Sequence, residues 1–239
     1  MTHPITTDPW ATCPPIDIHC HQKAQNDYPH ILSLDVHQLT AHDQSDDLAL
    51  ASAVFVSIGL HPWFIERQNI TEAMQTLTRM ARQARVLAIG ECGLDKCIAT
   101  PLARQIEVFI TQIELAETLG KPLIIHCVKA FNELLHIKKT RKLTLPWIIH
   151  GFNAHPAVAA ELIKQGCYLS FGKALLNDRS QAREALKQMS LERAFLETDA
   201  AENLSIGEIY AAAAKMTGLP IPALQQQIFK NFKRVFPHD

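Results

Sequence analysis

The sequence predicts an α/β protein folded as a TIM (β/α)8 barrel, in which the first βα unit is expected to be degenerate. Apolar runs that read as strands alternate with segments of helical periodicity. The runs are almost continuously apolar, as in parallel strands covered on both faces. Residues of metal-binding types follow these runs at points scattered along the chain. The carboxyl ends of barrel strands converge on one face, whereas in the alternative, an open doubly wound sheet, they would spread along an edge.

Eight apolar runs are the expected strands. The first follows Pro14-Pro15, which mark a turn into it. The span from His21 to Ser57 is too short for a complete strand–helix–strand unit, which is why the first βα unit is expected to be degenerate. The expected strands cover residues 16–19, 31–36, 54–59, 86–90, 123–125, 147–149, 167–171 and 194–196.

Helical spacing of apolar residues recurs between the strands. In the segment 102–119, Ile106, Phe109 and Ile113 fall in register, and Gly120 caps the helix. The segment 156–165 has Pro156 in its first turn and ends before Gly166. The expected helices cover residues 40–52, 71–85, 102–119, 131–138, 156–165, 181–189, 206–216 and 221–236.

Length and composition indicate one globular domain over residues 1–239, with 47% hydrophobic and 20% charged residues. The formal net charge of −1 argues against a protein that grips long nucleic acid, so any nucleic acid is expected to be held at an end or in a pocket. We expect no membrane association, since no apolar run reaches the length of a span. The absence of a secretory signal and of Cys-x-x-Cys pairs predicts a cytoplasmic protein with reduced thiols. No obligate protein partner is evident.

Candidate metal ligands follow five of the expected strands. Strand geometry places the side chains of His19 and His21 on the same face. Imidazole and carboxylate groups are the usual ligands of divalent transition ions, so their repeated appearance after strands predicts one shared site. The candidate ligands are His19, His21, Glu91, His126, His150 and Asp199.

Six side chains are too many for one catalytic ion, which must keep an open position, so we expect two divalent ions. Glu91, from a middle strand, would bridge ions roughly 3.5–4 Å apart. His19, His21 and Asp199 would hold one ion, because the first and last strands are neighbours in a closed barrel, and His126 and His150 would hold the other. The ligands favour Zn²⁺ or Mn²⁺, with Mg²⁺ as a further candidate. We expect Asp199 and Glu91 to be catalytic, with Asp199 as the general base on a metal-bound water.

Six short segments resemble, in order, the motifs of the TatD family of metal-dependent hydrolases. They are residues 19–21, 58–62, 88–95, 125–127, 149–152 and 196–199, and the resemblance runs from about residue 16 to residue 236. It implies a TIM barrel, divalent metals and hydrolysis of phosphodiesters, and it points to the same six ligands. His61 and Asp95 match motif positions and are expected to contact substrate. Many family members carry Arg directly after His-Cys; here Val128 stands there, and Lys129 is the expected phosphate contact.

We therefore expect a divalent-metal-dependent hydrolase of phosphoester bonds, acting as a TatD-like deoxyribonuclease on DNA ends or on a small phosphoester. Two alternatives keep the same ligands. One is an amidohydrolase-like enzyme acting on a small ester, amide or phosphoester, and the other is a non-catalytic metal-binding protein. The near-neutral net charge and the departure from the family's usual sequence at Ala200-Ala201-Glu202 motivate the first alternative.

Overall fold

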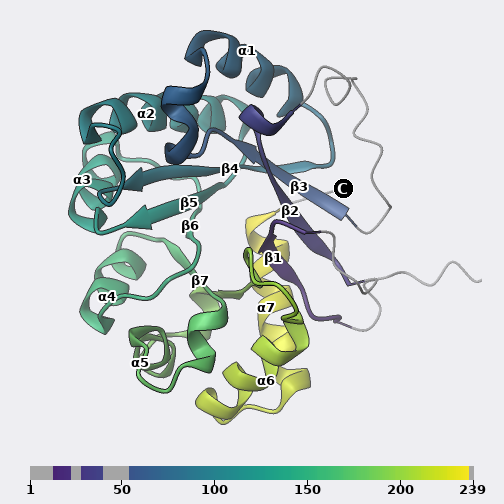
Figure 1. Cartoon of the computed structure of the whole chain (residues 1–239). Helices are drawn as coiled ribbons and strands as arrows, with labels where there is room; N and C mark the ends of the chain where they lie inside the picture. The colour runs from purple at the N-terminus through teal and green to yellow at the C-terminus, as the bar shows by residue number, and fades with distance from the viewer. Residues whose placement is uncertain (1–12, 23–27, 40–53, 237–239) are drawn as a thin grey trace, which may run out of the picture.

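The computed structural model describes residues 13–22, 28–39 and 54–236, and within them eight parallel strands follow one another in chain order around one sheet (Figure 1). This arrangement confirms the predicted barrel. The strands are β1 (Asp17–Cys20), β2 (His30–Asp35), β3 (Val54–Gly59), β4 (Val86–Asp95), β5 (Leu123–Val128), β6 (Trp147–Ile149), β7 (Tyr168–Phe171) and β8 (Ala194–Leu196).

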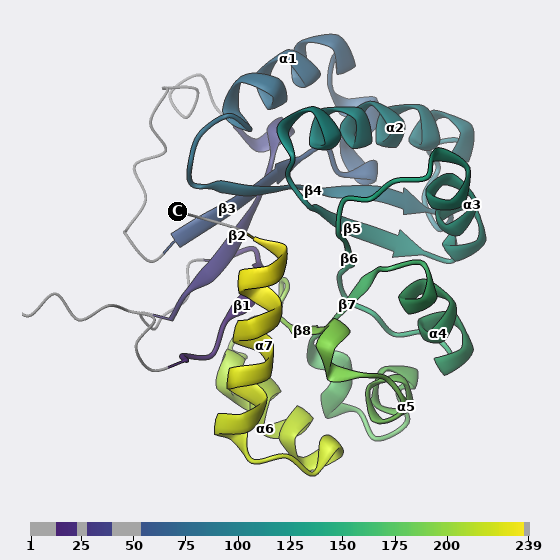
Figure 2. The same cartoon turned by 180° about the vertical axis from the view of Figure 1, so that it is seen from behind.

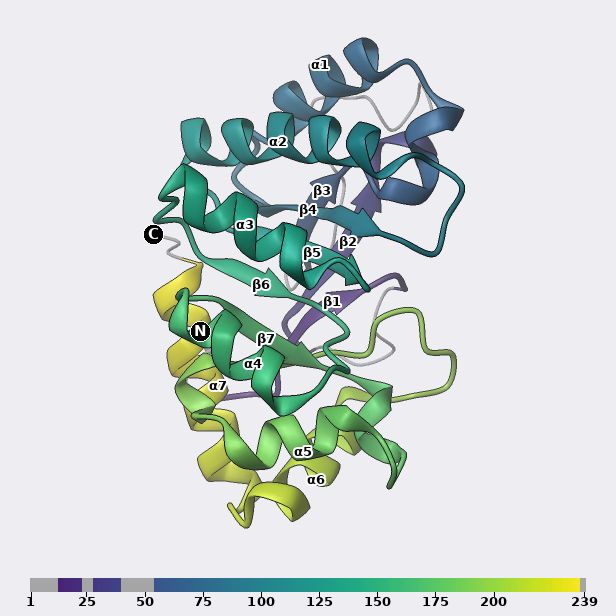
Figure 3. The same cartoon turned by 90° about the vertical axis from the view of Figure 1, so that its left-hand side faces the viewer.

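The helices lie between strands and cover the outside of the sheet. Figure 3 shows α2, α3, α4 and α5 following one another around it. The α-helices are α1 (Ile70–Met80), α2 (Leu102–Leu119), α3 (Phe131–Arg141), α4 (Pro156–Lys164), α5 (Gln181–Gln188), α6 (Ile206–Thr217) and α7 (Ile221–Val235). Short 3-10 helices are η1 (Val36–Gln38), η2 (Pro62–Arg67), η3 (Lys173–Leu176) and η4 (Leu191–Arg193).

The last helix, α7, packs beside the first and last parts of the sheet (Figure 2). Its Phe232 ring lies 6.2 Å from the ring of Phe55 in β3, and Phe236, just after the helix, lies 6.0 Å from Phe195 in β8. These aromatic contacts tie strands from opposite ends of the sequence to one element. In the described ranges, no helix combines the length and apolar character needed to cross a membrane.

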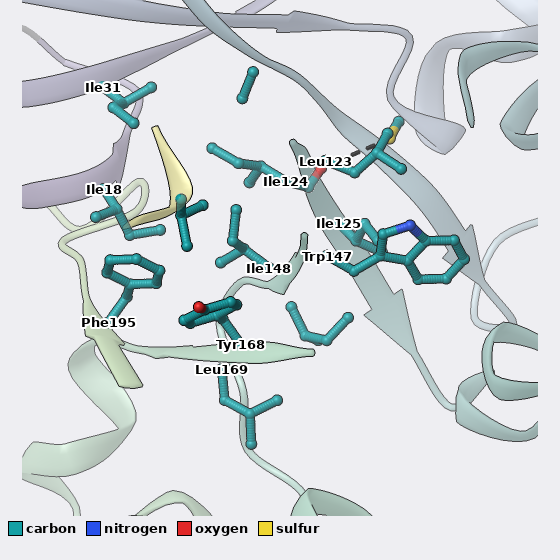
Figure 4. Close-up of a cluster of buried hydrophobic side chains, with 14 of the residues drawn as sticks. Ile18, Ile31, Leu123, Ile124, Ile125, Trp147, Ile148, Tyr168, Leu169 and Phe195 are labelled. Atoms are coloured by element: carbon teal, nitrogen blue, oxygen red, sulfur yellow. Dashed lines mark hydrogen bonds between the residues drawn. The ribbon is translucent and has the colours of Figure 1, made fainter. Parts of the chain in front are cut away.

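Buried aliphatic and aromatic side chains pack on both faces of the strands (Figure 4). Ile18, Ile148 and Phe195 are 0–1% exposed, and the Tyr168 ring lies 5.4 Å from the ring of Phe195. The near-continuous apolar strands therefore bury one set of side chains inside the barrel and the other against the helices, as in a packed TIM barrel.

The barrel closes between β8 and β1 through Asp199, three residues after the end of β8. The backbone N–H of Asp199 donates to the carbonyl of His19 at 2.9 Å, and the N–H of His21 donates to the carbonyl of Asp199 at 3.3 Å. Asp199 thus takes the place of a strand residue at the seam, and its side chain is held between two predicted ligands.

Several boundaries differ from those expected. β4 and β5 continue to Asp95 and Val128, so Glu91 and His126 lie within strands and not at their ends. Pairing with β5 resumes after a shift in register between Ile89 and Cys92, which the break in the apolar run did not reveal. The predicted helix 40–52 lies outside the described residues. Residues 21–29 join the parallel pair β1 and β2, a connection shorter than a helical crossover usually takes, so the first βα unit is degenerate.

Candidate metal centre

All six candidate ligands meet at one end of the barrel, where all but the buried His19 line a cavity of about 490 Å³. His19, Glu91 and His126 lie in β1, β4 and β5. His21 and His150 directly follow β1 and β6, and Asp199 lies three residues after the end of β8. Glu91 stands at the centre, because each of its two carboxylate oxygens faces a separate group of imidazoles.

The Oε2 atom of Glu91 faces the ligands of the barrel seam. The Nε2 atoms of His19 and His21 each lie 3.3 Å from Oε2, and they lie 3.7 and 3.5 Å from Oδ1 of Asp199. An ion with tetrahedral bonds of about 2.0–2.2 Å separates its ligand atoms by roughly 3.3–3.6 Å. His19 is fully buried, and neither of its ring nitrogens has a hydrogen-bond partner among the described residues. The spacing and the unsatisfied nitrogen both fit a cation.

The Oε1 atom of Glu91 faces the second group of imidazoles. His150 Nε2 lies 2.7 Å from Oε1, His126 Nδ1 lies 2.9 Å from it, and the two histidine nitrogens are 3.4 Å apart. The two contacts to Oε1 have hydrogen-bond lengths, so this half of the centre is more contracted than the first. The nitrogen and carboxylate donors of both halves suit divalent transition ions.

Burial and the surrounding imidazoles act in opposite directions on the acids of the centre. Burial would raise the pKa of Glu91, but His150, His126 and His19 together hold it well below its usual range. The pKa of Asp199 is lowered to about 2, because a hydrogen bond from His21 and the charges of His150 and His19 outweigh burial. Hydrogen bonds to Asp199 and Glu91 raise the pKa of His21 to about 9. Both carboxylates are therefore ionised at neutral pH, as metal ligands must be.

A buried carboxylate beneath the seam fixes the chain around Asp199. Asp17 accepts hydrogen bonds from the Thr198 N–H at 3.1 Å and the Thr198 hydroxyl at 2.5 Å. Burial raises the pKa of Asp17 to about 7 against these bonds. The pair joins β1 to the end of β8 on the residue next to a ligand, so it holds Asp199 in place.

Asp95 orients the ring of His126. Its Oδ2 lies 3.1 Å from His126 Nε2 and accepts a hydrogen bond from Trp63 Nε1 at 2.8 Å, while its Oδ1 accepts from the backbone N–H of Cys97. A carboxylate on the far nitrogen of a histidine fixes the tautomer that leaves the near nitrogen free for a metal. Asp95 is 2% exposed, so its carboxylate serves the histidine and does not face the cavity.

His150 is supported in a looser way by Glu197. The Nδ1 atom of His150 lies 3.6 Å from Glu197 Oε1, which accepts a hydrogen bond from the Gly151 N–H at 2.6 Å. Glu197 is fully buried at the end of β8. The Glu-Thr-Asp segment therefore contacts the end of β6 as well as supplying a candidate ligand.

His61 joins the centre as a hydrogen-bond donor to Glu91. Its Nδ1 accepts from the Trp63 N–H at 3.1 Å, so the proton of the neutral ring is assigned to Nε2, which lies 3.0 Å from Glu91 Oε1. A protonated nitrogen cannot bind a metal, although this atom lies close enough to Glu91 and His126 to form a possible ligand group. The hydrogen bond to Glu91 places His61 beside the cavity, where the sequence predicts that it contacts substrate.

A family model described as "TatD related DNase" matches residues 16–237. The chain belongs to the TatD family. This TatD protein is 30% identical, over 201 residues covering 78% of it and 75% of the relative, to the uncharacterized metal-dependent hydrolase YcfH of Escherichia coli K12. It is 38% identical to the human 3'-5' RNA nuclease TATDN2 over 164 residues, which cover 65% of this chain and 21% of that protein.

The crystal structure of YjjV, a TatD homologue from Escherichia coli K12, superposes with a TM-score of 0.83. The match covers 95% of this TatD chain and 100% of YjjV at 21% sequence identity. At this identity the likeness shows the fold alone, and it agrees with the eight-stranded barrel described above.

The structure also identifies cavity residues that the sequence did not single out. Lys173 follows β7 and lines the cavity together with Trp63, whereas the predicted phosphate contact Lys129 is exposed and is not among the described lining residues. Lys173 directly follows Gly172 at the end of an expected strand. Position after a strand also singled out the candidate metal ligands, but lysine is not a residue type that usually binds metals. Membership of the family makes this TatD protein a metal-dependent hydrolase. Among the described residues that line its cavity, Lys173 is a positively charged side chain that lies outside the family motifs.

Proposed function

We propose that this protein hydrolyses phosphodiester bonds at the end of a nucleic-acid strand, using two divalent ions. The observation that carries the proposal is the central position of Glu91, whose two oxygens each face their own group of imidazoles. One carboxylate between two sets of nitrogen ligands is the arrangement expected of a bridged pair of ions.

Two groups of residues would bind the two ions. His19, His21 and Asp199 would hold the first ion and His126 and His150 the second, with Glu91 common to both. Zn²⁺ and Mn²⁺ suit the imidazole-rich set best. Such a pair of ions supplies acidified water and neutralises charge on the transferred phosphoryl group.

Asp199 is the proposed general base. Its side chain is 31% exposed, whereas that of Glu91 is 6% exposed, so Asp199 is the ionised acid that solvent in the cavity reaches. The fixed backbone at the seam aims its carboxylate at the space between His19 and His21, where it accepts the proton of the attacking water.

Lys173 and His61 are the proposed contacts to the phosphate. Both line the cavity, and each side chain carries an N–H donor that suits a phosphate oxygen. The Lys173 ammonium would balance charge on the phosphate oxygens. When metal ions bind Glu91, the Nε2–H of His61 would donate to a phosphate oxygen in place of Glu91.

The near-neutral net charge favours attack at strand ends over binding along a duplex. DNA is the proposed substrate, because the matching family model is described as a DNase. The relative described as a 3'-5' RNA nuclease supports 3' ends as the point of attack and makes RNA the second strand to test.

Purified protein loaded with Mn²⁺, Zn²⁺ or Mg²⁺ should shorten 5'-labelled single-stranded DNA progressively from the 3' end. Glu91→Gln and Asp199→Asn should each lower kcat by about 10²-fold or more, the size of effect seen when one transition-state contact is removed. Glu107→Gln, on the exposed side of α2, is the control and should retain full activity. Equal cleavage by the wild type and Glu91→Gln would overturn the proposal, as would the absence of cleavage of both DNA and RNA.

A further inference from the structure

We propose that a single nucleic-acid strand leaves the metal cavity over the ring of Trp63 and continues along a groove beside Arg67. This inference rests on the proposed function, since it assigns the path of the substrate next to the scissile bond. Trp63 would stack against the base next to the cleaved phosphate, and Arg67 would bind a phosphate further along the strand.

Trp63 is an exposed aromatic residue held rigidly at the rim of the cavity. It is 54% exposed, the largest exposed fraction among the large hydrophobic residues of the described part of the chain. Its Nε1–H donates to Asp95, and its backbone N–H donates to His61. The ring is therefore fixed by two residues that themselves contact the metal centre, while much of its surface remains open to a ligand.

The groove adjoins the metal cavity, since the two hollows share lining residues. Trp63 and Phe64 line both the cavity and a second hollow of about 590 Å³, whose other lining residues are Arg67, Ile98, Ala99 and Thr100. The hollow lies between η2 and the loop that follows β4. A strand with a phosphate at the metals would pass over these two shared residues to reach the hollow.

Arg67 supplies the only charge among the described residues that line the groove. Its guanidinium stands 5.4 Å from the centroid of the Phe64 ring, and the side chain is exposed. That ring–cation contact holds the guanidinium against Phe64, which also lines the groove. A single cation in an otherwise uncharged groove is complementary to one backbone phosphate.

An aromatic platform followed by a cation is a common means of holding single strands without reading their sequence. Stacking accepts any base, because every base has a flat face. The groove's apolar wall at Ile98 and Ala99 also suits a base more than a hydrated phosphate. The combination therefore favours an unpaired strand as the occupant.

The test measures binding separately from cleavage. Protein loaded with Mn²⁺ is titrated with pentathymidylate that carries phosphorothioate linkages, which resist hydrolysis, and heat of binding and tryptophan fluorescence are recorded. Trp63→Leu and Trp63→Phe both lose the hydrogen bond to Asp95, so a difference between them isolates stacking. We expect the Leu variant to bind about tenfold more weakly than the Phe variant, within the range that stacking of one base supplies. Wild-type fluorescence should be quenched on binding, and that quenching should disappear in the Phe variant.

Arg67 is tested by the dependence of binding on salt. The affinity falls with salt, and each phosphate neutralised on a single strand makes the slope of log K against log salt concentration steeper by about 0.7. Arg67→Ala should therefore make this negative slope shallower by about 0.7. Arg82→Ala, which removes an exposed charge just beyond α1, is the matched control and should leave the slope unchanged.

The outcomes separate this inference from the proposed function. If unmodified DNA is cleaved while the Leu and Phe variants bind equally, the groove proposal is wrong and the nuclease proposal stands. The groove proposal also fails if Arg67→Ala and Arg82→Ala show the same slope, or if the wild type does not bind the oligonucleotide. Binding with the expected variant effects but without cleavage of any strand would support the groove and overturn the nuclease.

Discussion

The buried carboxylate of Asp95 orients a candidate metal ligand, His126. Its bond to His126 Nε2 determines which ring nitrogen is free, and it also anchors the indole of Trp63. Asp95→Ala should weaken metal affinity by about 10–100-fold, the usual cost of losing such an orienting partner. Competition with a metal-binding dye measures the affinity.

The control for Asp95 is an acid of the same charge that touches no ligand. Glu107→Ala, whose exposed side chain pairs with Arg104 on α2, should leave metal affinity unchanged. If Asp95→Ala binds metal as tightly as Glu107→Ala does, Asp95 does not orient His126, and direct substrate contact becomes its better interpretation.

The sequence predicted the residues that meet at the centre because each follows or lies in an apolar strand. It did not single out Lys173 or Trp63 as cavity residues, since one is not a ligand type and the other is exposed, and nothing local marks an exposed tryptophan as part of a site. The orienting roles of Asp17 and Asp95 were also hidden. Each depends on a partner on another strand, which only the folded chain provides.

Helix α2 supports the centre through two buried glutamines that lie two turns apart on one face. The Gln105 side chain accepts from the Asp95 N–H at 2.7 Å and donates to the Asp95 carbonyl at 2.9 Å. Gln112 makes the same pair of bonds to Leu60, at 2.8 and 3.1 Å. The helix thereby satisfies the backbone at the ends of β3 and β4, beside His61 and Asp95.

Gln105→Leu should destabilise the metal-free protein by about 1–3 kcal/mol, because it leaves two buried backbone groups of Asp95 without partners. Urea unfolding measures the change. Gln75→Leu, at an exposed position of α1, makes the same substitution without that loss and should change stability by less than about 0.5 kcal/mol. Equal effects of the two substitutions would show that the Gln105 bonds do not support the strand.

At the level of elements, periodicity predicted every strand and each α-helix in the described ranges, several of them with shifted ends, but not the 3-10 helices. Two features could not be predicted from it. β4 continues beyond Gly90 because it pairs again with β5, and pairing depends on a partner strand and not on the local run of apolar residues. Helix α1 ends at Met80, five residues before the expected end. The expected end was too late because the pattern of apolar residues continues into the turn that follows the helix.

Across the whole molecule, the ligands come from β1, β4, β5, β6 and β8 or the residues that follow them, so bound metal should stabilise the barrel as a unit. Metal at about 100 times its dissociation constant adds roughly 2.7 kcal/mol of stability. Thermal unfolding should therefore show a higher Tm with increasing Mn²⁺ or Zn²⁺ and a lower Tm after chelation. Glu91→Ala should make the Tm much less sensitive to metal, and an unchanged wild-type Tm on chelation would count against any resident metal.

The use of Asp199 to join the two edges of the barrel has a consequence for protein synthesis. His19 and His21 leave the ribosome early, but the residue that completes their half of the centre follows 178 positions after His21. A nascent chain therefore exposes an incomplete pair of histidines for most of translation and acquires the finished centre only when its ends meet. Metal-dependent activity would then be confined to completed molecules.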